Sequence, residues 1–379
     1  GGGRDLRRLR VGLFAGEGRD SSNQGSDAMK QAAPPRVFRI ALVGCGRIST
    51  NHFDAIRKVD GLGLSAVCDA DEGRARAAGE AQGVPWFSNY AKMLASAECE
   101  AVTICTPSGI HSAQGIQAAN ASKHVITEKP MSITLEQADA LVQACDSANV
   151  TLFVVKQNRL NPSVQLLKRA VDKGRFGRIY LANTTVRWQR PQEYYDAAPW
   201  RGTWEFDGGA FMNQASHYVD LIQWLLGPVE SVVAKTATQA RHIEAEDSGI
   251  AVLRFRSGAL GVIEVNILTY PRNWEGSVTI IGEKGTAKIG GTAVNRIDHW
   301  EFAEYDDDDK LIDSSATSPP SVYGFGHEGY YRNVLAVLSG AARPETDGRA
   351  GRKSLELILG IYESAKTGRD VPLPLRSAL

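Results

Sequence analysis

Residues 37–155 alternate short apolar runs with segments of helical character. Parallel strands have such near-continuous apolar sequences, because helices cover both faces of their sheet. Strands alternating with helices at this spacing predict a doubly wound parallel sheet. The expected strands are 37–43, 62–68, 101–105, 124–127 and 151–155, and the expected helices are 72–82, 110–121, 135–148 and a run ending at 57.

The pattern changes after about residue 160. Strand candidates then follow one another without helices between them, which favours a largely antiparallel sheet and an α+β second half. These candidates are 229–239, 247–255, 259–268, 277–281 and 286–289, after an alternating strand at 179–188, with helices expected at 160–173, 209–226, 326–338 and 351–367.

Composition narrows the class of protein. Lys+Arg and Asp+Glu both number 43, and this balance removes a global electrostatic argument for nucleic acid or an anionic membrane as partner. No apolar stretch reaches membrane-spanning length, and residues 1–35 lack the apolar core of a secretory signal. The cysteines are odd in number and form no C-x-x-C pair, which indicates buried, reduced thiols in a cytoplasmic protein without a zinc site: Cys45, Cys68, Cys99, Cys105 and Cys145.

A glycine-rich turn follows the first expected strand. Gly44-x-Gly46-x-x-Ser49 departs from G-x-G-x-x-G at its third position, where a small Ser still allows close helix–strand packing. The two glycines permit a tight turn, and the next helix offers free N–H groups to a pyrophosphate. Asp69 ends the second strand and can accept both ribose hydroxyls, which favours NAD over NADP. We therefore expect a Rossmann dinucleotide-binding domain. Arg74 and Arg76 lie close to Asp69 in the sequence, so NADP is not excluded as the cofactor.

Three further segments carry candidate chemistry. Glu128-Lys129-Pro130 closes a strand, so its lysine faces the crevice where ligands of an open α/β sheet bind. Residues 105–111 also follow a strand, so they would lie at the same crevice edge, beside the ribose or nicotinamide. A plain strand-to-helix turn explains this segment equally well. Asn213 and His217 are spaced i, i+4 in the helix expected at 209–226, which places them on one face. The acidic run 305–310 is typical of a solvated loop, and we assign it no function.

These motifs resemble, in order, those of the Gfo/Idh/MocA family of NAD(P)-dependent sugar oxidoreductases, over about residues 36–375. The motifs are GCGRIS, VCDAD, CTPSGIH, EKP, VKQNRLNP and WRGTWEFDGGAFMNQASHYVDL. Longer stretches, such as RPQEYYDAAPWRGTWEFDGGAF and SVYGFGHEGYY, resemble the UDP-N-acetyl-2-amino-2-deoxy-D-glucuronate dehydrogenases of that family. Those enzymes oxidise the sugar 3-hydroxyl of UDP-N-acetylglucosaminuronic acid, and the product is transaminated toward diacetamido uronic acids of surface polysaccharide such as the lipopolysaccharide O-antigen.

The resemblance implies a fold, a cofactor and an assembly. We expect a tail or extension at 1–35, the Rossmann domain at 36–158, and a substrate-binding and oligomerisation domain at 159–379. The second domain is expected to hold a large open-faced antiparallel sheet. NAD is the expected cofactor, UDP-N-acetylglucosaminuronic acid the expected substrate, and a homotetramer the expected assembly.

The resemblance also implies roles for individual residues. Lys129 and His217 fall on the catalytic positions, with His217 as general base and Lys129 stabilising the oxygen, or with the two roles exchanged. Related enzymes often have Asp four residues before the His, whereas this chain has Asn213, which cannot act as a base. Expected cofactor contacts are Gly44, Gly46, Arg47, Ile48, Asp69, Thr106, Pro107, His111, Glu128, Gln157, Trp200 and Arg201; expected substrate contacts are Lys129, Arg159, Asn161, Asn213, His217, Tyr323 and His327, with Arg190 and Arg201 as further anion ligands.

Three other functions stay open from the sequence. An inositol or free-sugar dehydrogenase needs no cationic residues to bind a carboxylate or a diphosphate. An NAD-dependent glycosidase oxidises the 3-position only transiently and releases sugar without net NADH. A non-catalytic NAD sensor needs neither Lys129 nor His217.

Overall fold

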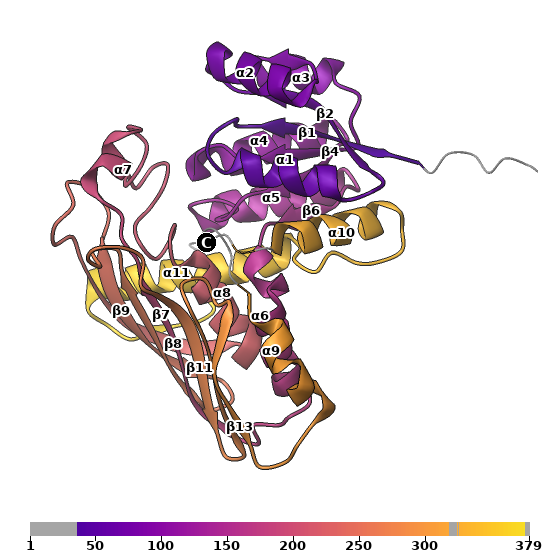
Figure 1. Cartoon of the computed structure of the whole chain (residues 1–379). Helices are drawn as coiled ribbons and strands as arrows, with labels where there is room; N and C mark the ends of the chain where they lie inside the picture. The colour runs from indigo at the N-terminus through magenta and orange to yellow at the C-terminus, as the bar shows by residue number, and fades with distance from the viewer. Residues whose placement is uncertain (1–35, 318–323, 325, 376–379) are drawn as a thin grey trace, which may run out of the picture. The chain divides into compact units, whose positions relative to one another are not determined.

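A computed structural model describes residues 36–317, 324 and 326–375. Two sheets organise this part of the chain (Figure 1). The expected tail at 1–35 and Tyr323 lie outside the described residues. Within the described residues, no helix combines the length and apolarity that a membrane crossing requires.

The first sheet is parallel and has the strand order β3-β2-β1-β4-β5-β6, which is the dinucleotide-binding order. Its strands are β1 Phe38–Val43, β2 Leu62–Cys68, β3 Trp86–Phe87, β4 Ala101–Ile104, β5 His124–Thr127 and β6 Leu152–Val154. The connecting helices are α1 Ser49–Lys58, α2 Glu72–Gln82, α3 Tyr90–Ser96, α4 His111–Asn120 and α5 Leu135–Ser147, with a 3₁₀ turn η1 at Ser108–Ile110. The expected parallel sheet is confirmed, and Gly44, Gly46, Asp69 and Lys129 follow the carboxyl ends of its strands.

The second sheet has the order β13-β12-β11-β7-β10-β9-β8-β14 and is antiparallel except between β7 and β10. Its strands are β7 Ile179–Arg187, β8 Val229–Ala237, β9 Ser248–Phe255, β10 Leu260–Asn266, β11 Glu275–Gly282, β12 Gly285–Gly290, β13 Arg296–Phe302 and β14 Val371–Pro372. The remaining helices are α6 Pro162–Asp172, α7 Gln192–Asp196, α8 Ser216–Leu226, α9 Ile312–Ser315, α10 Gly326–Leu338 and α11 Gly348–Thr367, with 3₁₀ turns η2 Gln157–Leu160 and η3 Asp307–Leu311.

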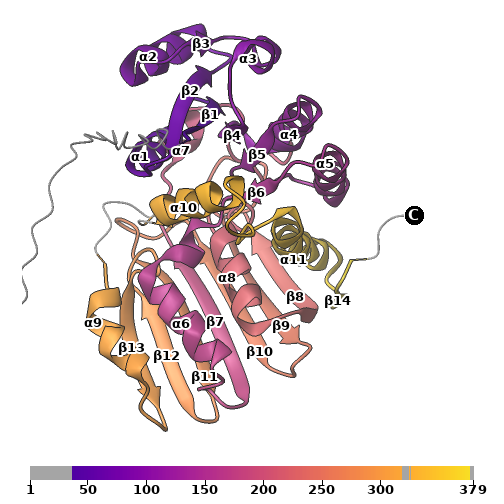
Figure 2. The same ribbon diagram turned by 90° about the vertical axis from the view of Figure 1, so that its right-hand side faces the viewer.

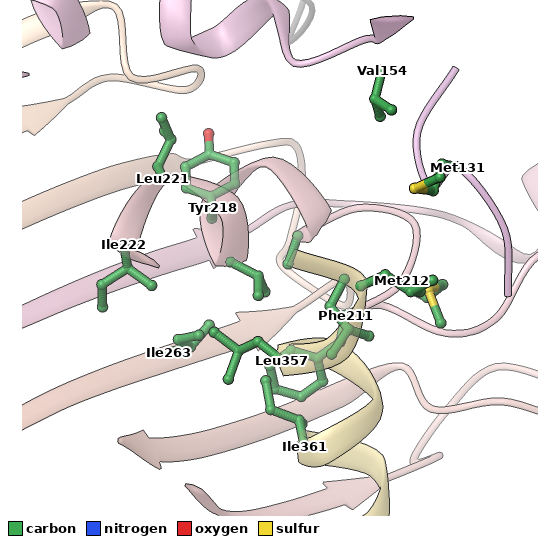
Figure 3. Packing of buried hydrophobic residues seen from close by; sticks show 14 of the residues in the cluster. Met131, Val154, Phe211, Met212, Tyr218, Leu221, Ile222, Ile263, Leu357 and Ile361 are labelled. Atoms are coloured by element: carbon green, nitrogen blue, oxygen red, sulfur yellow. The ribbon is translucent and has the colours of Figure 1, made fainter. Parts of the chain in front are cut away.

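Helices α6, α8 and α11 cover one face of this second sheet (Figure 2). Their apolar side chains form a continuous core with the strands, and Figure 3 shows Ile222 of α8 and Leu357 of α11 gathered around Ile263 of β10. The same core reaches Met131, directly after the Glu-Lys-Pro segment. The loop that carries Lys129 therefore rests on the core that carries the second sheet.

Helix α10 crosses the expected domain division. It lies late in the sequence, yet Tyr330, Tyr331 and Val334 pack with Phe38 and Ile56 of the first sheet's layer. The described residues from Val37 on accordingly form one compact unit, and the boundary near residue 158 stays a prediction.

One expected helix is shorter than its sequence indicated. Residues 208–215 form turns, and α8 begins only at Ser216. Gly208 has φ +75°, and Asn213 N–H donates to the carbonyl of Gly209 before the chain enters the helix. The prediction that Asn213 and His217 share a helical face is therefore wrong, because Asn213 lies in the turns that precede α8.

Candidate active site

Two neighbouring cavities, of about 780 and 700 Å³, open beside the carboxyl edge of the parallel sheet. The first follows the ends of β1, β2, β4 and β5. The second is bounded by the end of β7, the loop after β10 and the start of α8. Arg47, Lys129, Tyr194, Arg201 and Asn213 line both, so the two cavities meet at these residues.

The first cavity has the features that a dinucleotide needs. Gly44 has φ +94°, and a Cβ there would lie 2.6 Å from the carbonyl carbon of Cys105, so only glycine lets β1 turn past the end of β4. No side chain of the described residues caps the N-terminus of α1, and its first turn holds no acid, which leaves that end to an anion. The Asp69 carboxylate accepts N–H bonds from Cys45 and Asp71, at 2.9 Å each, and is fixed at the cavity wall. These residues fit an NAD whose pyrophosphate meets α1 and whose ribose meets Asp69.

The Glu-Lys-Pro segment is held rigidly from behind. His52 on α1 lies 3.0 Å from the Glu128 carboxylate through Nε2, while its Nδ1 lies 2.9 Å from the hydroxyl of Tyr331. Burial would raise the pKa of Glu128, but His52 and the neighbouring cations hold it well below its usual value. The Lys129–Pro130 peptide is cis, and the Pro130 carbonyl lies 2.8 Å from the ring of His111. The backbone that presents Lys129 is thus fixed from several elements.

The His52, Glu128 and His327 side chains bring three ligand-type atoms within 4.8 Å of one another. Both nitrogens of His52 already have partners in Tyr331 and Glu128, so we interpret the group as a hydrogen-bond network that supports Lys129. His327 belongs to this buried network and lines neither cavity. Its expected contact with the substrate is therefore not supported by its position.

Lys129 faces Asn213 across the boundary of the two cavities. Its Nζ donates to the Asn213 backbone carbonyl at 2.9 Å and to Oδ1 at 3.3 Å. Burial lowers the pKa of Lys129, and the charges of Glu128 and Asp207 oppose that effect. Asn213 Nδ2 in turn donates to the carboxylate of Asp207.

His217 points into the second cavity from the first turn of α8. Neither ring nitrogen has a hydrogen-bond partner among the described residues, although the side chain is buried. Burial, together with the charges of Lys129 and Lys156, lowers its pKa well below the usual value. The imidazole is therefore neutral at physiological pH, with a lone pair available to a bound hydroxyl.

Every residue expected to contact the cofactor lines the first cavity, and Lys129, Asn213 and His217 line the second. Two expected substrate residues lie elsewhere. Arg159 donates from Nε and Nη2 to Asp220, at 2.7 and 2.8 Å, and Asn161 donates to the carbonyl of Ala293. Both are buried and line neither cavity, and the Arg159 charge is neutralised within the core, so the structure does not bring these two residues to the site.

Asp207 and Arg272 are among the polar cavity residues that were not predicted from the sequence. Asp207 is buried at the wall of the first cavity, and Arg272 is exposed at the second. Asp207 stands directly before Gly208-Gly209 in the motif WRGTWEFDGGAFMNQASHYVDL, and this position could have indicated a site residue. Arg272 lies in the loop between β10 and β11, where nothing in the local sequence marks a ligand contact.

Comparisons with known proteins match both halves of the chain. Residues 38–156 match the model of the oxidoreductase family with an NAD-binding Rossmann fold, and residues 164–288 match the Gfo/Idh/MocA C-terminal domain. The D-apiose dehydrogenase of Paraburkholderia graminis is 29% identical over 353 residues, covering 89% of this chain and 90% of that protein. The myo-inositol 2-dehydrogenase of Thermotoga maritima is 30% identical over 254 residues, covering 65% of this chain and 74% of that protein.

Two solved structures are more similar. The WlbA dehydrogenase from Bordetella pertussis, in complex with NADH and UDP-GlcNAcA, is 55% identical with a TM-score of 0.88, covering 91% of this chain and all of that one. The WlbA dehydrogenase from Chromobacterium violaceum, with the same two ligands, is 54% identical with a TM-score of 0.86, covering 91% and 99%. The chain belongs to the Gfo/Idh/MocA family of oxidoreductases, whose Rossmann domain binds NAD.

Proposed function

We propose that this protein oxidises the sugar 3-hydroxyl of UDP-N-acetyl-D-glucosaminuronic acid to the 3-keto uronate, with NAD⁺ as the acceptor. Its likeness to two WlbA dehydrogenases solved with NADH and UDP-GlcNAcA supports this substrate. The observation that carries the proposal is the charge of the second cavity.

That cavity is strongly cationic in a chain whose formal net charge is zero. Among its lining residues one side chain is an acid, Glu193, and five are bases: Arg47, Lys129, Arg190, Arg201 and Arg272. Arg47, Arg201 and Arg272 form no ion pair with any described residue, and Arg201 Nε is buried without an acceptor. Guanidinium groups bind phosphate and carboxylate in bidentate fashion. A nucleotide-linked uronate supplies both groups, whereas inositol and free sugars supply neither.

The chemistry is divided between the two cavities. NAD⁺, when bound, supplies the hydride acceptor. We assign His217 as the base that takes the hydroxyl proton, because its neutral ring lines the second cavity and neither ring nitrogen is bonded to a described residue. Lys129 lines both cavities and donates a hydrogen bond to the same oxygen, stabilising its developing negative charge. The exchanged assignment remains the alternative, because burial also favours neutral Lys129.

Formation of NADH with a panel of substrates tests the proposal. We expect turnover with UDP-N-acetylglucosaminuronate, little with UDP-N-acetylglucosamine, and none with inositol or free glucuronate. Mass spectrometry of the product should show a loss of two hydrogens with the UDP still attached. Turnover of inositol alone would refute the proposal, and release of UDP or sugar without net NADH would identify a glycosidase instead.

Variants of the two catalytic residues separate an enzyme from an NAD sensor. Lys129→Met and His217→Asn should each lower kcat by about 100-fold or more, within the range for a lost general acid or base. Asp196→Asn, which changes an exposed acid outside both cavities, is the matched control. Wild-type turnover in both catalytic variants, with NADH still bound, would contradict the assigned roles.

We further propose that the reaction serves biosynthesis of diacetamido uronic acids for lipopolysaccharide O-antigen or another surface polysaccharide, in the cytoplasm. The sequence resemblance supports this placement, because a 3-keto uronate is a substrate for transamination. An aminotransferase dependent on pyridoxal phosphate, added with an amino donor, should convert the product to a 3-amino sugar. Failure of several such enzymes to consume the product would count against the placement.

We also propose that the protein is a homotetramer assembled through the open face of the second sheet. This face carries two cross-strand apolar rows, Val233 beside Val252 and Leu181 between Leu260 and Ile281. Ile250 on the same face is 54% exposed. Exposed apolar patches of this kind mark protein interfaces. Light scattering should give four chains for the wild type and fewer for Ile250→Lys; a monomeric wild type would overturn the proposal.

A further inference from the structure

The side-chain amide of Asn213 lies between a cation and a buried anion. Its Oδ1 accepts from Lys129 Nζ at 3.3 Å, and its Nδ2 donates to the Asp207 carboxylate. An ionised carboxylate only accepts hydrogen bonds, so Asp207 requires the NH₂ end of the amide. The orientation that turns Oδ1 toward Lys129 is therefore set by Asp207.

Asp207 is itself fixed in place. Its side chain is 1% exposed, and its second oxygen accepts the backbone N–H of Gly202 at 2.8 Å. It forms no ion pair with any described residue; the nearby cations are Lys129 and Arg201. Burial raises the pKa of Asp207 to about 6, so the carboxylate is ionised at pH 8.

We propose that Asp207 is a positioning residue for Lys129, acting through the amide of Asn213. It holds the amide oxygen toward the ammonium group and supplies the negative charge that position 213 lacks. This inference rests on the proposed function for its kinetic consequence, but not for its geometry. The other charged or titratable groups that act on Lys129 or respond to it are Glu128, Arg190, Lys156 and His217.

The arrangement makes two single substitutions act in opposite directions. Asp207→Asn removes the negative charge, so the ammonium form of Lys129 is less stable and its ionisation moves to lower pH. Asn213→Asp places a carboxylate directly against Nζ, which moves the same ionisation to higher pH. It also sets two carboxylates in contact, and one of them must hold a proton. The double exchange restores one carboxylate and one amide between Gly202 and Lys129.

The experiment measures kcat/KM for UDP-N-acetylglucosaminuronate against pH in the wild type and these three variants. In Asp207→Asn we expect the limb governed by Lys129 to fall by roughly one pH unit, as for loss of a nearby opposite charge. We expect kcat/KM to drop about 10-fold, as for loss of a supporting partner. The double exchange should lose less than the product of the two single losses. Asp196→Asn, again the matched carboxylate-to-amide control, should leave the profile unchanged.

A second readout does not need the substrate. Lys129 lines the cofactor cavity, so its charge affects the dissociation constant for NADH, followed by fluorescence against pH. Asp207→Asn should shift that profile to lower pH in the presence of Lys129 and cause no shift in a Lys129→Met background. If Asp207→Asn fails to fold, the upward shift expected for Asn213→Asp decides the question alone.

The outcomes are separable. Unshifted profiles in both readouts, or single losses that multiply in the double exchange, would show that Asp207 has only a structural role. Absence of wild-type turnover would refute the proposed function while leaving the NADH profiles to test Asp207.

Discussion

Replacing Arg159 with methionine distinguishes a structural arginine from a substrate ligand. Arg159 makes two hydrogen bonds to Asp220, whose exposure is 2%, and lines neither cavity. Removing one partner of a buried ion pair costs about 3–5 kcal/mol, because the remaining charge is left without its counterion. Lys156 stays 3.7 Å from Asp220, so we expect the lower end of this range, about 3 kcal/mol. At about 2 °C per kcal/mol for a chain of this size, the melting temperature should fall by about 6 °C.

The assay pairs thermal melting with the KM for UDP-N-acetylglucosaminuronate. In Arg159→Met the melting temperature should fall while KM stays within about 2-fold, and adding Asp220→Asn should recover most of the lost stability because the unpaired charge is removed. Arg272→Met is the matched contrast, because Arg272 is exposed at the second cavity and forms no ion pair with a described residue. It should raise KM about 10-fold, the loss of roughly one charge-assisted contact, with an unchanged melting temperature. A tenfold rise in KM for Arg159→Met without loss of stability would refute the reasoning.

Three further predictions follow from single contacts. Asp69→Ser should raise the ratio of NADP to NAD turnover, because it removes a carboxylate that repels a 2′-phosphate and leaves Arg74, 3.4 Å from Asp69, to bind it; an unchanged ratio would count against that role. Gly109→Ala should weaken NADH binding measured by calorimetry, because its Cβ would lie 2.1 Å from the carbonyl oxygen of Glu205 in the loop over the cavity, whereas Gly329→Ala, with nothing nearer than 3.6 Å, should be neutral. Burial raises the pKa of Glu246 to about 7, so the folded state keeps a proton that the unfolded state loses, and stability falls as pH rises from about 4.5 to 7. Glu246→Gln should remove up to about 3 kcal/mol of that fall, seen as a melting-temperature gain over wild type that is larger at pH 8 than at pH 5.

The parallel sheet could be predicted closely, because its signal is local. The strand at 62–68 and the helix at 72–82 have the bounds that the sequence indicated, since apolar runs and Gly or Asp punctuation specify them directly. Strand β13 was missed for the converse reason. Its sequence RIDHWEF is mostly polar, and the strand is defined by pairing with β12 rather than by an apolar pattern.

Partners distant in the sequence account for the other errors. The acidic run at 305–310 is not merely a solvated loop: Asp309 pairs with Arg175 and accepts from the indole of Trp300, and Lys173 pairs with Asp306. The two ion pairs join residues more than a hundred positions apart and leave no periodic signal. The site divides in the same way, because the motif residues of the cofactor cavity are local to strand ends, while the link from Lys129 to Asp207 depends on how the turns before α8 fold.

Arginine shows most clearly why residue type alone cannot define the substrate site. Three arginines are each paired with one or two carboxylates: Arg159, Arg175 and Arg187. Their charges therefore add little to the electrostatic potential around the protein. Arg47, Arg201 and Arg272 have no such partner among the described residues, and all three line the second cavity. The formal net charge of the chain is zero, and its acids neutralise the paired arginines. The unpaired arginines therefore form a local excess of positive charge at the second cavity. A cationic cavity on a neutral protein attracts an anionic ligand without attracting nucleic acid or membranes in general, and this contrast is what a dehydrogenase for a nucleotide-linked uronate requires.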